Sequence, residues 1–501
     1  MPYVWGWIRI NTWDFDEPVP LSVTCHLPPK HACPGWFNRC AGGNKFADRA
    51  FPHLTVCDFW VRTQFSIAVC LLCLLVLGSV QALAEEAPIT PRALPAIDQR
   101  RAEQAGLRRL ESDHLTLYTD LPASAAIDEL PVVFDAAVAQ WAKYFNIAPQ
   151  RTRAWRMRAF LINDRAKFAA LGLLPRERPD FKNGFATEKE LWIVEQPSDY
   201  YRRHLLLHEG THGFMHAMLG GAGPGWYSEG MAELFATHTW QAQRLHLRQM
   251  PADRQVVPMW GRIKIVREAH DKGTGLPLLA VLQLDQGRRF STGEYAWCWA
   301  LCTFLDSHLD WQATFRQLPQ WVTDRDFNGR FRELFRAQWP ELLVEWQAFI
   351  AELDYGYEAR RMAMQHRSPV LLQSAAQVTV AADRGWQSTG WMLQAGREYK
   401  FSASGRYMIA HDTAPWFCEP EGVTLRYHAG QPLGKLLGVL RSEDAGLSPT
   451  LALGLGAVLK PKRPAVLYLR VNDSPARLSD NRGELTASIA PDQPLEKHEV
   501  P

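Results

Sequence analysis

The feature that most constrains this chain is the pentapeptide HEGTH at residues 208–212, which lies within a helical pattern at residues 199–219. Residues four apart on a helix lie one above the other, so the imidazoles of His208 and His212 can face one metal ion. Glu209, one position along, can reach a water molecule beside that ion and accept its proton. The spacing therefore predicts a zinc-binding helix with Glu209 as the general base.

A second helix is predicted after a Gly-rich loop, where the chain reads WYSEGMAE at residues 226–233. This segment resembles the W-x-x-E-G-x-A-E helix of gluzincin metallopeptidases, in which the first Glu is the third zinc ligand. Sixteen residues separate His212 from Glu229, enough for a turn that returns the second helix to the first. The resemblance implies that Glu229 completes a site of two histidines and one glutamate, with one position left for water.

Three further residues near the predicted zinc ligands have more than one possible role. Glu233, one turn after Glu229, either orients a ligand histidine or is a charge on a solvated helix face. His204 and His216 extend the histidine stripe, and we expect them to pack or to contact the ligands rather than to bind zinc. A metzincin would need a third histidine six residues after the second, and that position is Met218. The metzincin interpretation therefore fails.

The resemblance to the peptidase-MA-like gluzincins extends over about residues 111–350 and includes YAWCWAL at residues 295–301. It implies zinc-dependent hydrolysis of peptide bonds in a peptide or protein substrate, and it leaves open whether cleavage is internal or terminal. Tyr295 is either the group that stabilises the oxyanion of the tetrahedral intermediate or a buried aromatic that anchors its helix.

The N-terminal part contains an uncharged apolar run at residues 65–78, preceded by a basic residue and followed by a small-residue site. This pattern is typical of a secretory signal peptide, here residues 61–84, and the run is shorter than the about 20 residues of a membrane span. An uncleaved anchor is the alternative, and only then would a membrane be a partner. We expect residues 1–60 to be a doubtful extension, with initiation near Val61, and the protein to be secreted or periplasmic.

The rest of the chain divides by its periodicity. A polar linker is predicted at residues 85–110. Strand and helix patterns then alternate before helices dominate, so residues 111–355 are predicted to form the metallopeptidase domain, a zincin-like α/β lobe with a helical lobe. Short alternating segments between turns predict an all-β sandwich at residues 370–491. The expected fold class is therefore α+β and multidomain. The net charge of +2 argues against a nucleic-acid partner.

The β module resembles the PA-I galactophilic lectin family over about residues 376–490, through the stretches GWQSTGW, VND and SDNRGE. The resemblance implies that Asp473, Asp480 and Asn481 bind calcium, which prefers hard oxygen donors. Ordinary β-turns also gather these residue types. The family's sugar-contacting His and Gln have no counterpart in WFCEPEG at residues 416–422. A targeting or scaffold role is thus favoured over carbohydrate binding.

Two functions from different classes follow from these features. The first is a secreted or periplasmic zinc metallopeptidase of gluzincin type with an appended β sandwich. The second is a non-catalytic cell-surface protein that binds calcium or carbohydrate and carries a purely structural zincin lobe. The intact Glu209 favours the enzyme, because a protein without the reaction has no chemical need for the base.

Overall fold

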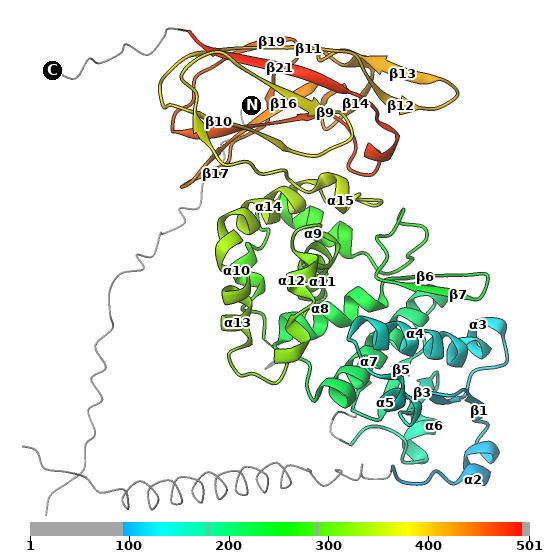
Figure 1. Cartoon of the computed structure of the whole chain (residues 1–501). Coiled ribbons are helices and arrows are strands. Elements are labelled where there is room, and N and C mark those ends of the chain that lie inside the picture. Colours follow the sequence, from blue (N-terminus) through cyan, green and yellow to red (C-terminus); the bar gives the residue numbers. More distant parts are fainter. Residues whose placement is uncertain (1–93, 177, 179, 286–289, 493–501) are drawn as a thin grey trace, which may run out of the picture. The chain divides into compact units, whose positions relative to one another are not determined.

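All the helices and strands labelled in Figure 1 lie between residues 99 and 491. In the computed structural model the described residues are 94–176, 178, 180–285 and 290–492. The predicted extension at residues 1–60 and the predicted signal peptide at residues 61–84 lie outside them. Among the described residues, no helix combines the length and the apolar character needed to span a membrane.

The first part is built on a mixed five-stranded sheet. Its strands are β1 (Arg108–Glu111), β2 (Leu115–Thr119), β3 (Met157–Ile162), β4 (Gly184–Ala186) and β5 (Glu190–Val194). They lie in the order β1-β2-β3-β5-β4, with the three central strands parallel and the two edge strands antiparallel to their neighbours. Parallel strands are covered on both faces, which explains why the central strands are nearly continuous apolar runs. β4 is the last strand of the sheet, and its outer edge pairs with no other strand among the described residues.

A different cluster of hydrophobic side chains is buried on each face of this sheet. On one face Leu117 and Leu161 belong to the main hydrophobic core, together with side chains of the central helices. On the other face Tyr118, Phe160 and Trp192 stack in a row, with ring centroids 5.9 and 5.6 Å apart. The accompanying helices are α2 (Gln99–Gln104), α3 (Ala125–Asp128), α4 (Leu130–Tyr144), α5 (Pro149–Arg153), α6 (Arg165–Ala170) and α7 (Asp199–Leu219). The alternating pattern of the sequence therefore forms a layered α/β arrangement.

The helix α7 carries the HEGTH motif and has clear signals at both ends. Ser198 caps its start, because the hydroxyl accepts a hydrogen bond from a first-turn backbone N–H. It ends before Gly220, whose φ of 77° is left-handed and suits glycine. A short loop then leads into α8 (Gly225–Ala236), which lies against α7. The two predicted motif segments are thus neighbouring helices.

Between the end of α8 and residue 362 the chain is mainly helical, apart from one hairpin. The hairpin is β6 (His238–Gln241) and β7 (Arg244–Leu247), and the helices are α9 (Arg262–Asp271), α10 (Leu278–Val281), α11 (Thr292–Ser307), α12 (Gln312–Phe315), α13 (Phe327–Leu334), α14 (Trp339–Glu352) and α15 (Ala359–Met362), with the 3-10 turns η1 (Leu318–Trp321) and η2 (Arg336–Gln338). The helix α11 packs against both α8 and α9. It therefore supports α8, the second of the two motif helices.

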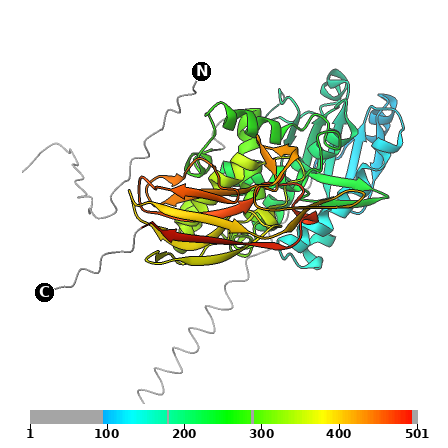
Figure 2. The same ribbon diagram turned by 90° about the horizontal axis from the view of Figure 1, so that it is seen from above.

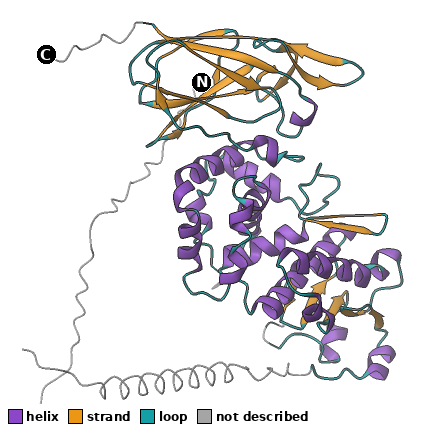
Figure 3. Cartoon of the chain, in the orientation of Figure 1, coloured by secondary structure: helices purple, strands orange, loops and turns teal. Residues whose placement is uncertain are grey.

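The C-terminal part is all β, shown in orange in Figure 3. Its strands are β8 (Val370–Leu371), β9 (Ala376–Ala381), β10 (Gln387–Leu393), β11 (Tyr399–Ser404), β12 (Tyr407–His411), β13 (Pro415–Cys418), β14 (Val423–His428), β15 (Gln431–Leu433), β16 (Leu436–Ser442), β17 (Gly446–Leu447), β18 (Leu451–Ala452), β19 (Gly456–Leu459), β20 (Ala465–Val471) and β21 (Glu484–Pro491), with the 3-10 turn η3 (Leu478–Asp480). One sheet runs β17-β16-β20-β10-β8 with β18 beside β16, and the other runs β19-β11-β21-β9.

The two sheets share one core, which makes this part a sandwich (Figures 1 and 2). Leu467 and Leu469 of β20 contribute from one sheet, and Phe401 and Ile489 contribute from the other. Alternate residues of β11 are buried, as expected for a strand with one covered face. The predicted all-β segment is therefore present.

The sandwich contacts α14 through buried charged groups. Glu352 pairs with Arg470 of β20. Glu345, 3% exposed, accepts hydrogen bonds from His308 Nε2 at 2.6 Å and from His366 Nε2 at 2.8 Å. A small apolar cluster drawn from α14 and the β10-β20-β16 sheet surrounds these pairs. The contact is thus a mixture of apolar packing and paired charges, although Arg470 Nε has no hydrogen-bond partner among the described residues.

The coarse fold class, α+β with helices and several sheets, is confirmed. The helical pattern at residues 199–219 and the strand pattern at residues 190–194 coincide with α7 and β5. The predicted linker at residues 85–110 differs in its second half, where α2 and β1 form. Ala102 and Leu107 are buried there against the outer face of the sheet, so tertiary packing gives order to a polar segment.

Candidate metal centre

Three of the predicted site residues converge between α7 and α8. His208 Nε2 and His212 Nε2 each lie 3.2 Å from Glu229 Oε2. The two imidazole nitrogens lie 3.3 Å from each other. His208, His212 and Glu229 therefore present one donor atom each to a common point, and we call this group the metal centre.

These distances can be compared with the geometry of a bound metal. In a tetrahedral zinc site with bonds of about 2.0–2.1 Å, neighbouring donor atoms lie about 3.3 Å apart. The three observed separations of 3.2, 3.2 and 3.3 Å match the edges of such a tetrahedron. Two imidazoles and one carboxylate are also ligands that zinc accepts. The residues present therefore fit a zinc ion with a fourth position left open.

The charges of the centre favour a bound cation. Burial alone would raise the pKa of Glu229, but His212 and His208 outweigh it and lower the pKa to about 2. Burial would lower the pKa of His208, but Glu229 and the neighbouring carboxylates raise it to about 9. A proton is thus held at the place that a metal ion would take, so binding of a metal ion there would release protons.

The second nitrogen of each histidine also has a neighbour. His208 Nδ1 lies 3.5 Å from Glu233 Oε1, and His212 Nδ1 lies 3.2 Å from Ser228 Oγ. The Ser228 contact is within hydrogen-bond distance, whereas His208 Nδ1 makes no hydrogen bond among the described residues, so Glu233 acts on it through charge alone. Ser228 directly precedes Glu229, the predicted third ligand, yet the sequence offered no reason to choose it.

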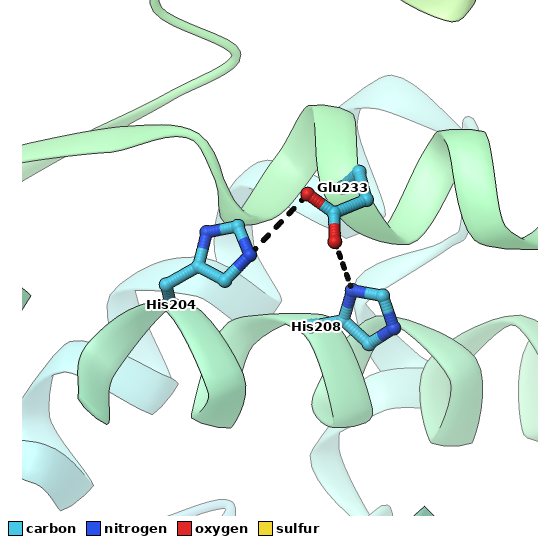
Figure 4. A group of neighbouring side chains, drawn as sticks. All are labelled: His204, His208 and Glu233. Atoms are coloured by element: carbon cyan, nitrogen blue, oxygen red, sulfur yellow. Dashed lines mark ion pairs between the residues drawn. The ribbon is translucent and has the colours of Figure 1, made fainter. Parts of the chain in front are cut away.

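Glu233 sits in a dense group of charged and polar side chains (Figure 4). It is 2% exposed, so the alternative of a solvated helix-face charge is wrong. Its carboxylate lies between His208 and His204, whose Nε2 is 3.4 Å from Glu233 Oε2. Arg262 pairs with the same carboxylate through two nitrogens, at 2.8 and 3.1 Å. Burial would raise the pKa of Glu233, but the charges of Arg262 and His204 hold it well below its ordinary value.

Glu209, the predicted general base, is buried beside the edge strand β4. Burial raises the pKa of this carboxyl group, and the nearby His208 and His212 oppose the shift. A Cβ atom added at Gly184 would come within 2.3 Å of Glu209 Oε1. Only a residue without a side chain leaves room for the carboxylate there. Gly184 was missed in the sequence, although a glycine inside a strand pattern signals a close approach.

A cleft of about 900 Å³ opens over the metal centre. Its lining includes β4 and the residues that lead into it, the inner face of α7, and Tyr295 of α11. The ring of Tyr295 lies 5.8 Å from that of His208, centroid to centroid. Burial and the nearby carboxylates raise the pKa of its phenol, which therefore stays protonated as a hydrogen-bond donor. The position suits both roles considered for Tyr295.

The free edge of β4 borders this cleft. Val194 N–H donates to the Asn183 carbonyl, and Thr187 N–H donates to the Glu190 carbonyl. In an antiparallel pair, hydrogen-bonded residues alternate with residues whose peptide groups point to the other side. The peptide groups of Gly184 and Ala186 therefore point away from β5, toward the open edge.

Close packing fixes the helices of the centre. A Cβ atom at Gly210 would come within 2.6 Å of Phe134 on α4. One at Gly230 would come within 2.4 Å of Cys302 Sγ on α11. Glycines at these two positions therefore let α7 and α8 approach their neighbours, and the ligand distances follow from that rigid packing.

A second polar group lies in the loop after β20 and includes the three predicted calcium ligands. Each of its side chains has a buried oxygen with no hydrogen-bond partner among the described residues: Asn472 Oδ1, Asp473 Oδ2, Asp480 Oδ1 and Asn481 Oδ1. We call this group the oxygen cluster. Burial raises the pKa of Asp473 to about 7, with Asp480 adding to the shift. Unpaired buried oxygens of this kind are what a hard cation would bind.

The two amides of the oxygen cluster are held by their nitrogen atoms. Asn472 Nδ2 donates to three backbone carbonyls at 2.9 to 3.1 Å. Asn481 Nδ2 donates to the Ala382 carbonyl at 3.0 Å. Their Oδ1 atoms thus stay free to accept. Asn472, part of the VND stretch, was not among the predicted ligands, and its burial rather than its type distinguishes it.

Comparison with known proteins adds little to this geometry. No protein-family model matches the chain. A nicotinate phosphoribosyltransferase from Enterobacter sp. (strain 638) is 27% identical over 176 residues, which are 33% of this chain and 43% of that protein. The chain thus spans less than half the length of this relative. Among solved structures, an EclA N-terminal domain described as a PllA-like lectin is 19% identical, covers 23% of this chain and 95% of its own, and has a TM-score of 0.19.

Proposed function

We propose that the protein is a zinc-dependent peptidase of gluzincin type. The observation that carries the proposal is the set of donor distances among His208, His212 and Glu229, 3.2 to 3.3 Å, which match the separations expected between ligands of a tetrahedral zinc ion. Glu209 supports it further, because a buried carboxylate beside the centre is the group that this hydrolysis needs.

A zinc ion bound there would polarise the scissile carbonyl and acidify a water molecule. Glu209 accepts the proton of that water, and its raised pKa suits it to return the proton to the leaving amine. Tyr295, with a protonated phenol on the cleft wall, is placed to donate a hydrogen bond to the oxyanion of the substrate.

The edge of β4 favours a peptide as the substrate. An extended peptide can add as a further strand to a free sheet edge, where backbone hydrogen bonds hold it regardless of its side chains. The outward peptide groups of Gly184 and Ala186 offer this pairing along the cleft. Gly184 also contacts the Glu209 carboxylate, so a peptide on this edge would lie beside the base.

The β sandwich is proposed to bind calcium at the oxygen cluster and to act as a targeting or scaffold module, with carbohydrate as one candidate partner. The unpaired oxygens of Asn472, Asp473, Asp480 and Asn481 support the calcium. The proposed secreted or periplasmic location rests on the signal-peptide pattern at residues 61–84.

Metal analysis tests the proposal. We expect about one zinc per chain in the wild type and in Glu209→Gln, and a large loss in Glu229→Ala. Hydrolysis of an unbiased peptide mixture should then occur with the wild type alone. Zinc bound without hydrolysis would favour the non-catalytic alternative, and no zinc in any variant would contradict the metal site itself.

A further inference from the structure

The ion pair between Arg262 and Glu233 connects the metal centre to a helix outside both motifs. Arg262 is the first residue of α9 and follows Gly261, whose φ of 62° is left-handed. Its side chain is 4% exposed. Nε and Nη2 contact the two carboxylate oxygens of Glu233, at 3.1 and 2.8 Å, and Nη1 donates to the Trp260 carbonyl at 3.2 Å. The guanidinium is therefore fixed at three nitrogens.

This geometry restricts what the Glu233 carboxylate can do. A fork of two parallel N–H···O bonds holds the plane of a carboxylate as well as its charge. Oε1, which accepts from Arg262 Nη2, is also the atom that faces His208 Nδ1 at 3.5 Å. The 3.5 Å contact is an ion-pair distance and not a hydrogen bond, so the fixed carboxylate attracts His208 Nδ1 by its charge, and in this orientation of the ring Nε2 faces Glu229.

Arg262 also reaches the other side of the cleft. Its guanidinium carbon lies 5.9 Å from the ring centroid of Tyr295, within the range of a cation–π contact. One buried cation thus contacts the carboxylate behind a ligand histidine and the aromatic ring that faces the substrate space. Neither contact requires Arg262 to touch the metal or the substrate.

We propose that Arg262 is a positioning residue of the metal centre, which orients the His208 imidazole through Glu233 and thereby raises the affinity for zinc. The inference rests on the proposed function, because it assumes that His208 Nε2 binds the metal. It differs from a structural ion pair in one respect: the fork geometry, and not only the charge, controls metal binding.

The test uses the full chain and two variants. Arg262→Met/Glu233→Gln removes both buried charges and keeps an acceptor near His208, so no unpaired charge is left to unfold the protein. Arg262→Lys keeps the charge but loses the fork. We expect both to bind zinc about 10- to 100-fold more weakly than the wild type in competition with a chromogenic chelator. We also expect their cobalt(II) forms to show an altered visible absorption band.

Arg267→Met, on the exposed side of α9, is the matched control and should bind zinc like the wild type. Wild-type zinc affinity in Arg262→Lys would show that charge alone matters and would overturn the inference. So would wild-type affinity in the double variant, since the pair would then be merely structural. A wild-type protein that binds no zinc would instead overturn the proposed function, which keeps the two failures distinct.

Discussion

The metal centre and the oxygen cluster both bury carboxylates, but they satisfy them differently. At the metal centre the carboxylate of Glu229 lies 3.2 Å from both His208 Nε2 and His212 Nε2, and the carboxylate of Glu233 is paired with Arg262. In the oxygen cluster each side chain keeps one buried oxygen without a partner. The first group stands on two packed helices, whereas the second lies in a loop that contains η3.

This difference suggests what each group can bind. Imidazole nitrogens held on packed helices suit zinc, which takes few ligands in a rigid geometry. Oxygens on a loop suit calcium, which takes more ligands and tolerates irregular geometry. Leaving several buried acceptors unpaired costs stability, so the oxygen cluster should depend on its cation for stability more than the metal centre does.

The largest effect should come from Glu209→Gln, which removes the base of the metal centre alone. General-base catalysis contributes about 10²–10⁴-fold, so we expect kcat for peptide hydrolysis to fall by that factor. Zinc content and the response to calcium should not change, because Glu209 belongs to neither ligand set. Turnover of a fluorogenic peptide and metal analysis of the same sample measure this.

Glu268→Gln, an exposed carboxylate change on α9, is the control for that variant and should keep wild-type turnover. If Glu209→Gln retained more than about a tenth of the activity, the observed hydrolysis would not use Glu209 as its base.

Glu345 is a buried carboxylate outside both groups, and unlike the side chains of the oxygen cluster its two oxygens both have hydrogen-bond partners. Burial would raise its pKa, but hydrogen bonds from His308 and His366 lower the pKa below the ordinary 4.5. The paired carboxylate therefore stabilises the fold above pH 4.5, and this stabilisation is lost as the pH falls through the folded-state pKa. We expect Glu345→Gln to lower the free energy of unfolding by about 3–5 kcal/mol at pH 7. Thermal unfolding at pH 7 and below pH 4.5 measures it.

The variant should also flatten the acid-side loss of stability, because the titrating group is gone. Glu333→Gln, an exposed carboxylate paired with Arg336, should change neither the stability nor its pH dependence measurably. Equal acid sensitivity of Glu345→Gln and the wild type would show that other groups control unfolding in acid.

The response to calcium tests the oxygen cluster, the second of the two groups compared. At about a hundredfold excess over its dissociation constant, a ligand that binds only the folded state adds about 2.7 kcal/mol of stability. We expect calcium to raise the unfolding temperature of the wild type, and the increase to disappear in Asp473→Asn. Asp444→Asn, an exposed carboxylate in the same sandwich, should respond like the wild type. If calcium did not stabilise the wild type, water or protons rather than calcium would satisfy the unpaired oxygens.

The two groups also differ in how far the sequence could predict them. The four-residue spacing of His208 and His212 is a property of one helix, so α7 and the convergence of its two imidazoles could be predicted locally. The approach of Glu229 to the two histidines depends on how α8 packs against α7. For Glu233 the sequence left two roles open, and only its burial in the structure distinguishes them. Arg262 could not be found, because α9 lies far along the chain and its contact with Glu233 exists only after folding. For the oxygen cluster, residue types pointed to Asp473, Asp480 and Asn481, but Asn472 is recognised only by its buried, unpaired oxygen.

The smallest effect concerns the junction of the metal centre with β4. In Gly184→Ala the new Cβ would lie 2.3 Å from Glu209 Oε1, and the backbone there is not left-handed, so the side chain of Glu209 has to move. Overpacking of this kind costs about 1–3 kcal/mol, and we expect the lower end because a side-chain tip can shift. We expect kcat to fall roughly tenfold, less than the about 10²-fold that a 1 Å misplacement can cost.

The decisive readout is the separation of rate from metal binding in Gly184→Ala. Zinc affinity should stay at the wild-type value, because the displaced carboxylate is not a ligand, while the rate falls. Gly293→Ala is the matched control, since its nearest neighbour would be 3.8 Å from the added Cβ, and it should keep both properties. Unchanged turnover in Gly184→Ala would mean that Glu209 acts from a position away from β4. A substrate bound at the edge of β4 would then not lie beside the base.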